Sequence, residues 1–240
     1  MKKILLCIFL SGTISLSIAQ TSFKLIIDAG ANESSFHQPS SNMTTATSVQ
    51  QNSYSNLMGY HFEALAEFNI DQISIQSGLG YSAIGSKGSE YYSETFGSGA
   101  SSYTTSSSLT STEKLNYFEI PLNILYNIPV AKTGKVFVGG GPYIAFGSSG
   151  TYSNSGASTA PDAITGETSS TPISESQSIT FGSTGDVKST DYGINAIAGF
   201  SYKDGLLIKI GYGFGLANIA TSGAKTTNNV LRVSLGYSFF

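Results

Sequence analysis

Few residues of this 240-residue chain have side chains that could do chemistry. One histidine, His37, lies in a polar segment, and the other, His61, alternates with Glu63 in an apolar run. His37 could join a serine and an aspartate in a proteolytic or lipid-acylating site, but no spacing selects its partners among so many serines. His61 is more simply a packed structural residue. The pattern therefore predicts no enzyme.

Two further motifs contain residue types that can bind phosphate or calcium. Glycines 139–141 are not followed by the Lys-Ser/Thr pair of a phosphate loop, so they predict a bulge or a close approach of neighbouring strands. Asp162, Glu167 and Glu175 could bind calcium, yet their spacing is not that of a known calcium loop. We therefore expect no cofactor and no metal.

The first residues have the pattern of a secretory signal. Lys2 and Lys3 precede an apolar run, and Ser17-Ile18-Ala19 is a small-x-small cleavage site. We expect a signal peptide at 1–19 and one domain at 20–240. The single cysteine, Cys7, lies inside the signal, so the mature chain has no thiol for a disulfide or a metal.

The composition limits the class of protein. Charged residues make up 11% of the chain, against roughly 25% in soluble domains. The net charge of −3 gives no basic face for nucleic acid. No segment after the signal approaches the roughly 18 uninterrupted apolar residues of a membrane-spanning helix. If the chain is integral to a membrane, it must be so as a barrel.

Alternation with a period of two recurs through the chain and indicates strands. Between Leu206 and Leu216 every second residue is large and apolar, and most of the others are glycine or lysine. The expected strands are 22–30, 58–69, 73–84, 114–126, 135–146, 191–202, 206–216 and 228–239.

The connections between these strands alternate in length. Those at 69–72, 127–134 and 203–205 are short, whereas 31–57, 85–113, 147–190 and 217–227 are long and rich in Ser, Thr and Gly. The sequence thus predicts an all-β fold: an eight-stranded antiparallel up-and-down transmembrane β-barrel with short periplasmic turns and long extracellular loops. We expect those loops to be solvated, with room for strands that protrude past the membrane.

The polar face of the strands is expected to line the lumen. Aromatic pairs such as Phe118 and Tyr126 recur on the other face about 20 Å apart, close to the roughly 25 Å between the aromatic girdles of a membrane barrel. Small residues on the polar face would make room for charged side chains in so narrow a barrel. The predicted lumen charge network, a structural one, consists of Lys24, Asp28, Glu63, Glu67, Glu119, Asp191, Lys209 and Arg232.

Two features of the expected barrel are less regular. In 135–146, Phe137 and Tyr143 fall on the polar face, which leaves the register of this strand open. Pro121 and Pro142 are nearly equidistant from one short turn and should lie almost opposite each other. Because proline cannot donate to a ladder, we expect a missing rung where Pro121 meets the strand before it and Pro142 the strand after it.

Several strand motifs resemble the PorT-like outer-membrane β-barrel family of Bacteroidota. They are YFEIPL at 117–122, KVFVGGGPY at 135–143, DYGI at 191–194, GYGFGL at 211–216 and LGYSFF at 235–240. The resemblance covers most strands and none of the long loops. It implies fold and outer-membrane placement. Family members with assigned roles serve protein secretion, a role that strand motifs do not transfer.

These observations predict a non-enzymatic integral outer-membrane barrel with a plugged lumen and loops that contact an envelope or external partner. Its other partners would be outer-membrane lipid and, during biogenesis, the barrel assembly machinery, which reads a terminal aromatic in phase with the outward residues. Tyr237 and Phe239 are in phase, and Phe240 is one beyond. The alternatives are a small-solute pore or transporter and a secreted soluble ligand-binding barrel.

Overall fold

Strands with one apolar and one polar face can close into a ring, and this chain does so. The computed structural model describes residues 21–37, 42–99, 102–162, 165–223 and 225–239. The expected signal peptide at 1–19, Gln20 and Phe240 lie outside the described residues. Within the described part of the chain, no helix has the length and apolar character needed to cross a membrane.

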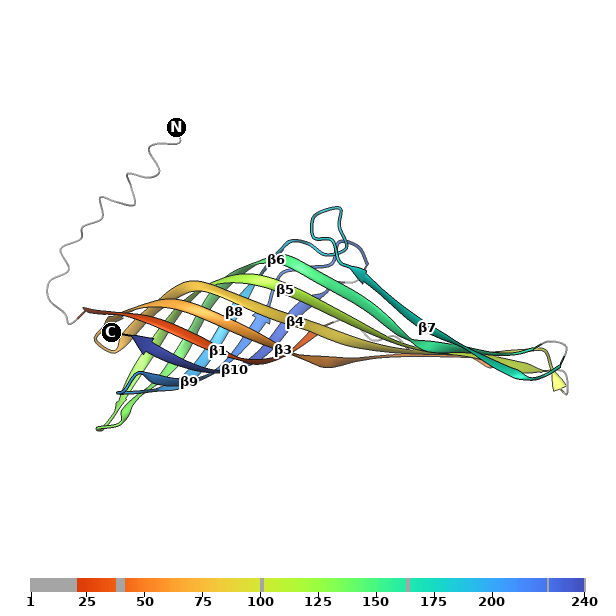
Figure 1. The fold of residues 1–240 in the computed structure, drawn as a ribbon, viewed down its shortest axis with the longest axis horizontal. Helices are drawn as coiled ribbons and strands as arrows, with labels where there is room; N and C mark the ends of the chain where they lie inside the picture. Colours follow the sequence, from red (N-terminus) through yellow and green to blue (C-terminus); the bar gives the residue numbers. More distant parts are fainter. Residues whose placement is uncertain (1–20, 38–41, 100–101, 163–164, 224, 240) are drawn as a thin grey trace, which may run out of the picture.

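The ring is antiparallel and all-β, as expected, and neighbours in sequence are neighbours in space (Figure 1). β1 pairs with both β10 and β3, which closes the ring. Its strands are β1 (Thr21–His37), β3 (Ser48–Ile70), β4 (Ile73–Phe96), β5 (Tyr103–Val130), β6 (Gly134–Pro161), β8 (Thr190–Tyr202), β9 (Leu206–Gly215) and β10 (Thr227–Phe239).

The short connections all lie at one end of the ring. Asp71, between β3 and β4, has φ 54°, and Ala131, between β5 and β6, has φ 42°. Gly205, between β8 and β9, has φ 96°. Left-handed residues reverse the chain within two or three positions, and Asp and Gly tolerate that conformation best. The turn expected at 127–134 is shorter than predicted, because β5 continues to Val130.

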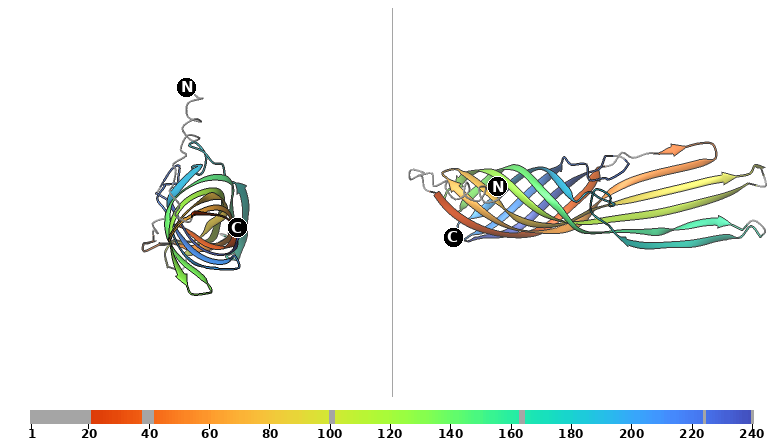
Figure 2. Two further views of the ribbon diagram at one scale, coloured as in Figure 1. Left: turned by 90° about the vertical axis from the view of Figure 1, so that its left-hand side faces the viewer. Right: turned by 90° about the horizontal axis from the view of Figure 1, so that it is seen from above.

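At the other end, β3 to β6 run far past the ring as paired hairpin arms, and β7 (Thr168–Ser178) adds to β6 (Figures 1 and 2). A small β2 (Met43–Thr44) pairs with β3. Much of 85–113 and 147–161 is therefore strand rather than loop. Both faces of these arms are solvated, so their Ser/Thr sequences need no apolar alternation and gave no signal of pairing.

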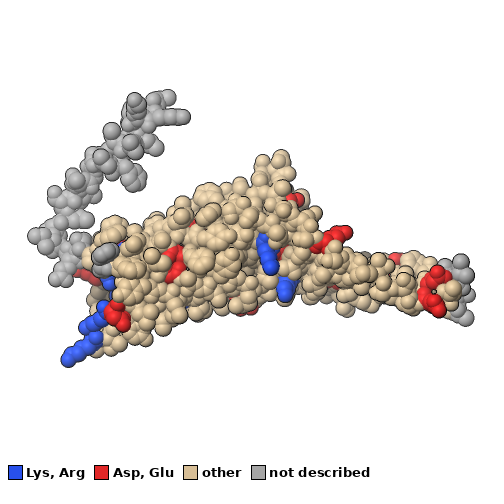
Figure 3. Space-filling model, viewed as in Figure 1, with Lys and Arg blue, Asp and Glu red and all other residues tan. Residues whose placement is uncertain are grey.

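The outer wall of the ring is apolar between two aromatic belts. Toward the hairpins, Tyr81 contacts Tyr60 and Phe118, with ring centroids 6.3 and 5.4 Å apart. Toward the turns, Phe23 and Phe68 lie 5.1 Å apart. Uncharged residues form most of the wall in Figure 3. The apolar face therefore points outward, where it can contact a hydrocarbon layer.

The register of β6 follows the same alternation throughout the wall. Phe137 and Tyr143 are buried inside the ring, whereas Val136, Val138 and Ile144 are exposed on its outside. The inner face of β6 thus contributes large rings to the lumen, which is why its pattern is ambiguous in the sequence.

The two prolines lie nearly opposite each other, as predicted, since Pro121 pairs with Tyr143. The pairing between β4 and β5 omits the positions between Ser77–Leu122 and Gly80–Glu119, which confirms the missing rung beside Pro121. The rung expected to be missing between Pro142 and β8 is present. That part of the prediction was wrong: the gap lies between β5 and β6, after Pro121–Tyr143 and before Ile124–Gly140.

Candidate functional sites in the lumen and above the ring

A first lumen cluster is centred on Lys209 of β9. Its Nζ donates to Asp28 Oδ2 of β1 at 2.8 Å and also forms an ion pair with Glu63 of β3. Asp28 and Glu63 are direct partners across the two strands. Like charges in that position repel each other, so one ammonium between them compensates both.

A second cluster is centred on Arg232 of β10. Its Nη2 lies 2.6 Å from Glu119 Oε2 of β5, and its Nη1 donates to Asn195 Oδ1 of β8 at 3.3 Å. Asn195 donates to the other carboxylate oxygen of Glu119 at 3.2 Å. A Cβ on Gly213 would lie 3.1 Å from Asn195 Oδ1, so the glycine leaves room for this cluster.

Asp191 and Glu67 lie apart from both of these clusters. Asp191 accepts from Asn228 Nδ2 at 2.8 Å. Glu67 accepts from Gln76 Nε2 at 2.6 Å and lies 3.1 Å from Lys135 Nζ. Lys24 is half-buried and lines a small cavity with Glu67 and Lys135. Lys135 is not in the charge network that the sequence predicts for the lumen. It shares a face of β6 with Phe137, so its inward orientation is evident only when Phe137 is known to lie in the lumen.

His61 is held in the lumen by a structural hydrogen bond. Its Nε2 lies 2.7 Å from Ser234 Oγ and 3.9 Å from Asp28 Oδ1. In a catalytic triad the serine and the carboxylate bind opposite ring nitrogens. Here one nitrogen faces both groups, and the histidine and aspartate side chains are fully buried. The geometry is not that of a triad.

Buried apolar side chains point into the lumen in two groups toward the turns and in a third group at the mouth. Ile26, Leu65 and Leu207 form one layer near the turns, and Leu125, Phe137 and Ile197 form another. Leu207 therefore departs from the otherwise small or charged face expected for β9. Where the ring meets the hairpins a larger cluster fills the mouth; its members include Phe36, Leu115, Tyr117, Tyr143, Val187 and Ile219.

The three consecutive glycines of β6 permit close approach of its neighbours. A Cβ on Gly139 or Gly141 would overlap the carbonyl oxygen of Ile124 or Leu122, and one on Gly140 would overlap that of Asn195. This confirms the prediction of a close backbone approach.

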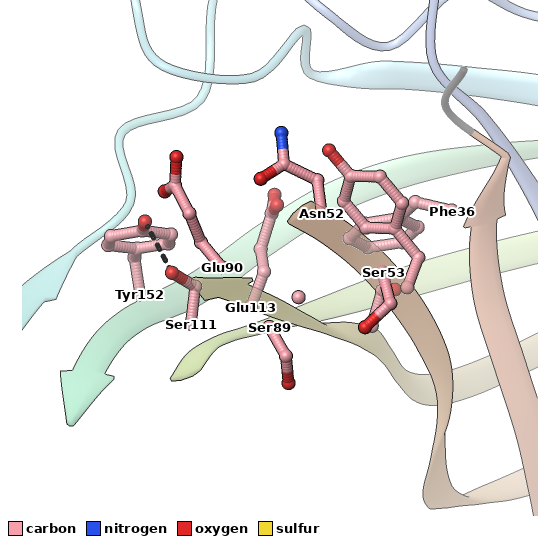
Figure 4. Close-up of a pocket in the computed structure, with 11 residues that line it drawn as sticks. Phe36, Asn52, Ser53, Ser89, Glu90, Ser111, Glu113 and Tyr152 are labelled. Atoms are coloured by element: carbon pink, nitrogen blue, oxygen red, sulfur yellow. Dashed lines mark hydrogen bonds between the residues drawn. The ribbon is translucent and has the colours of Figure 1, made fainter. Parts of the chain in front are cut away.

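Above the mouth cluster, the inner faces of the hairpin arms enclose a pocket of about 250 Å³ (Figure 4). Glu90 of β4 and Glu113 of β5 extend in the same direction within it, and Tyr152 of β6 donates to Ser111 Oγ at 3.1 Å. The lining residues are Phe36, Asn52, Ser53, Tyr54, Ser86, Gly88, Ser89, Glu90, Ser111, Glu113 and Tyr152.

Glu113 is the most strongly perturbed carboxyl group outside the ring. Burial, and then the nearby Asp186 carboxylate, raise its pKa to about 7. Asp186 behaves in the opposite way, because the backbone N–H and the hydroxyl of Thr180 donate to it at 2.8 and 2.7 Å and lower its pKa. Glu113 therefore titrates near neutral pH, and Asp186 stays ionised there.

The three carboxylates whose residue type could suit calcium, Asp162, Glu167 and Glu175, do not converge on one site. Asp162 Oδ1 accepts from the Thr165 N–H at 2.8 Å in a turn that Glu167 closes, while Glu175 is paired opposite Asn154. Among the residues that the structure describes, no group of three or more His, Cys, Asp or Glu side chains could hold a metal.

A closed ring with an apolar outer wall, aromatic belts and a polar, packed interior defines an integral membrane β-barrel. The chain belongs to the family described as "Outer membrane protein beta-barrel domain", which matches residues 12–221. Membership in this family places the protein in the outer membrane. No curated protein sequence matches the chain.

Two solved structures are similar to this chain at low sequence identity. Ail, the attachment invasion locus protein of Yersinia pestis, is 11% identical with a TM-score of 0.39, over 90% of this chain and 98% of Ail. A second structure of Ail holds the heparin analogue sucrose octasulfate. Neisserial surface protein A is 13% identical with a TM-score of 0.33, over 91% of this chain and 99% of that protein.

Proposed function

We propose that the protein is a non-enzymatic outer-membrane barrel with a plugged lumen, whose hairpin arms contact an envelope or external partner. The observation that supports the proposal is the set of buried charged and apolar side chains inside the ring. Ion pairs centred on Lys209 and Arg232 lie between the apolar layer of Ile26 and Leu65 and the cluster at the mouth. An eight-stranded barrel is only wide enough for its own side chains.

The charged side chains Lys24, Asp28, Glu63, Glu67, Glu119, Asp191, Lys209 and Arg232, with Lys135, then serve structure rather than transport. Each carboxylate with a nearby cation or amide loses less on leaving water than an isolated charge would. A small-solute pore is the competing function. It would require these groups to move aside in the resting protein.

Conductance in planar bilayers separates the two functions. The refolded protein should give no unitary current steps, because a plugged lumen would offer ions no water path. The double variant Phe137→Ala/Tyr143→Ala removes two buried lumen rings of β6 and should raise the ion leak. Its matched control, Val136→Ala/Ile144→Ala, trims outward side chains of the same strand and should stay silent. Reproducible steps from the unaltered protein would favour the pore.

We also propose how the signal peptide is removed and how the barrel is recognised for assembly in the membrane. Cleavage after Ala19 would give a mature chain that begins at Gln20, and N-terminal sequencing of protein from outer membranes tests this. Recognition by the barrel assembly machinery would use the outward aromatics of β10, Tyr237 and Phe239, whose rings lie 4.9 Å apart. Replacing both with serine should reduce the folded fraction in membranes. The matched control, serine at both Tyr212 and Phe214, removes an aromatic pair with ring centroids 4.4 Å apart from β9 and should reduce it less.

We further propose that the chain belongs to the PorT-like outer-membrane β-barrel family of Bacteroidota. The motifs at 117–122 and 135–143 support it, because they form the proline-broken pairing of β5 with β6 rather than generic strand. The arms of β3 to β6 are the surface we assign to a partner, since they project far from the ring. Cross-linking from single cysteines at Ser93 and Ser155 in intact cells, followed by mass spectrometry, would identify it.

A further inference from the structure

The pocket between the hairpin arms has an excess of negative charge. Glu90 and Glu113 line it, and none of its lining residues is a lysine, an arginine or a histidine. Gln50 Nε2 donates to Glu90 at 3.3 Å. Among the described residues, by contrast, the Glu113 carboxylate makes no ion pair and no hydrogen bond. A half-buried carboxylate without a partner is costly, and a bound cation would relieve that cost.

The walls of the pocket suit an organic cation better than a metal ion. Phe36, Tyr54 and Tyr152 contribute aromatic rings to the lining that Glu90 and Glu113 share. Aromatic faces attract ammonium and guanidinium groups electrostatically. Calcium prefers six to eight oxygen ligands, including several carboxylates, and here only two carboxylates line the cavity.

The size of the pocket sets an upper limit on the ligand. A volume of about 250 Å³ is below the roughly 300 to 1,000 Å³ of sites that enclose drug-sized molecules. It leaves space for one alkyl ammonium or guanidinium group. The pocket lies above the mouth cluster and outside the ring, so a ligand can reach it without crossing the lumen.

We propose that this pocket binds an organic cation, a primary ammonium or guanidinium group, between Glu90 and Glu113 with its alkyl stem against the aromatic rings. The cation can come from a free amine or from a lysine or arginine side chain of a partner. This inference rests on the proposed function only in that the hairpin arms lie outside the membrane.

Protonation of Glu113 should control the affinity. The titratable or charged groups near Glu113 on neighbouring elements are Asp186 of the 179–189 segment, Glu90 of β4, Tyr54 of β3 and Tyr152 of β6. Tyr117 lies near Glu113 on β5, the strand of Glu113 itself. With a pKa of about 7, Glu113 is mostly neutral at pH 6 and mostly ionised at pH 8. A cation that needs the ionised form should therefore bind about tenfold more tightly at pH 8.

The test uses the full mature chain, refolded in detergent, and calorimetric titration with 1,5-diaminopentane at pH 6 and pH 8. Its neutral isostere, 1,5-pentanediol, controls for the alkyl chain. A capped Gly-Lys-Gly peptide, compared with Gly-norleucine-Gly, tests the side-chain source of the same group. Calcium chloride is a further arm.

We expect the diamine or the lysine peptide to bind, with affinity about tenfold higher at pH 8 than at pH 6, and the neutral probes to give no heat. Glu113→Gln should lose at least tenfold in affinity and abolish the pH dependence. The matched control Glu167→Gln removes the same charge from an exposed turn outside the pocket and should bind as the unaltered protein does.

Three results would overturn the inference: no binding of either cation at millimolar concentration, binding of calcium or the neutral probes alone, or equal losses in both glutamate variants. None of these bears on the plugged lumen, which is tested by conductance in the absence of any ligand. A conducting barrel that still binds the diamine would reject the proposed function and leave the pocket standing.

Discussion

Asp28 and Glu63 lie directly opposite each other on β1 and β3, and the single ammonium group of Lys209 on β9 binds both carboxylates. The arrangement joins the first strand of the ring to the seventh, β9, through side chains inside the lumen. It also means that two acids of the lumen depend on one cation.

Replacing that cation should destabilise the barrel strongly. Lys209→Met leaves Asp28 and Glu63 as unpaired like charges in the lumen, which should cost about 3 to 5 kcal/mol. Urea unfolding in detergent, followed by the heat-modifiable band on gels, measures the loss. Lys114→Met, on an exposed lysine without an ion pair among the described residues, should change stability by no more than about 0.5 kcal/mol. A loss below about 1 kcal/mol for Lys209→Met would mean that water replaces the ammonium.

A second prediction tests which face of β9 contacts lipid. Ile210 is half exposed at the middle of the outer wall, and an acid there should cost roughly 2 kcal/mol because hydrocarbon cannot solvate it. Ile210→Asp should therefore reduce the folded fraction recovered from membranes. Ser201→Asp adds the same charge inside the ring, where it shares a small cavity with Lys24 and Lys135, and should assemble far better. Equal losses in the two variants would contradict the assignment of faces.

Leu207 would be a poor lumen control for that experiment, although it points inward. It is almost completely buried with Ile26 and Leu65, so an acid there would also disrupt packing. Alternation in the sequence assigns a side chain to a face. It does not indicate whether neighbours on that face are charged or apolar, because those neighbours come from strands far apart in the chain.

The sequence predicts the strands that separate lipid from the lumen, and it does not predict the strands that water surrounds. The alternation that predicts 206–216 corresponds to β9, and the short turn at 203–205 is present with Gly205 left-handed. These features depend on contrast between lipid and water. The hairpin arms lack that contrast, so the polar run around Ser107 appears as loop although it pairs with β4 and β6.

The sequence does not predict the pocket between the hairpin arms, because these arms lack apolar/polar alternation. Glu113 falls in a segment that the sequence predicts as a loop. Its pocket neighbours Tyr152 and Phe36 lie on strands that extend further than the sequence indicates. Lys135 was missed for a different reason, because the bulky Phe137 and Tyr143 obscure the inward face of β6. Both errors arise from side chains whose surroundings are set by register across the ring.

A third prediction concerns the gap in pairing beside Pro121. The hydroxyl of Ser77 on β4 donates to the Pro121 carbonyl at 2.8 Å, across the positions where the ladder is interrupted. Ser77→Ala should lower the free energy of unfolding by about 1 kcal/mol, as expected for one lost hydrogen bond. Ser77→Thr keeps the hydroxyl and should restore most of that stability. If the alanine and threonine variants unfold alike, the hydroxyl does not support the seam.

The last prediction concerns the cost of ionising Glu113 in the folded protein. Burial and Asp186 raise the pKa of Glu113 from 4.5 to about 7, so the folded protein holds this proton more tightly than the unfolded chain does. Below pH 4.5 both states are protonated and the fold carries no cost. As the pH rises through 7 the folded carboxyl ionises without a partner, and the cost reaches its full value of roughly 1 to 3 kcal/mol. Glu113→Gln should therefore unfold like the unaltered protein at pH 4 but at higher urea concentration at pH 8, in the absence of ligand.

The control is Glu167→Gln, a substitution in an exposed turn, which should show no such gain in stability at pH 8. A glutamine variant that is no more stable at pH 8 would mean that Glu113 has a partner in solution.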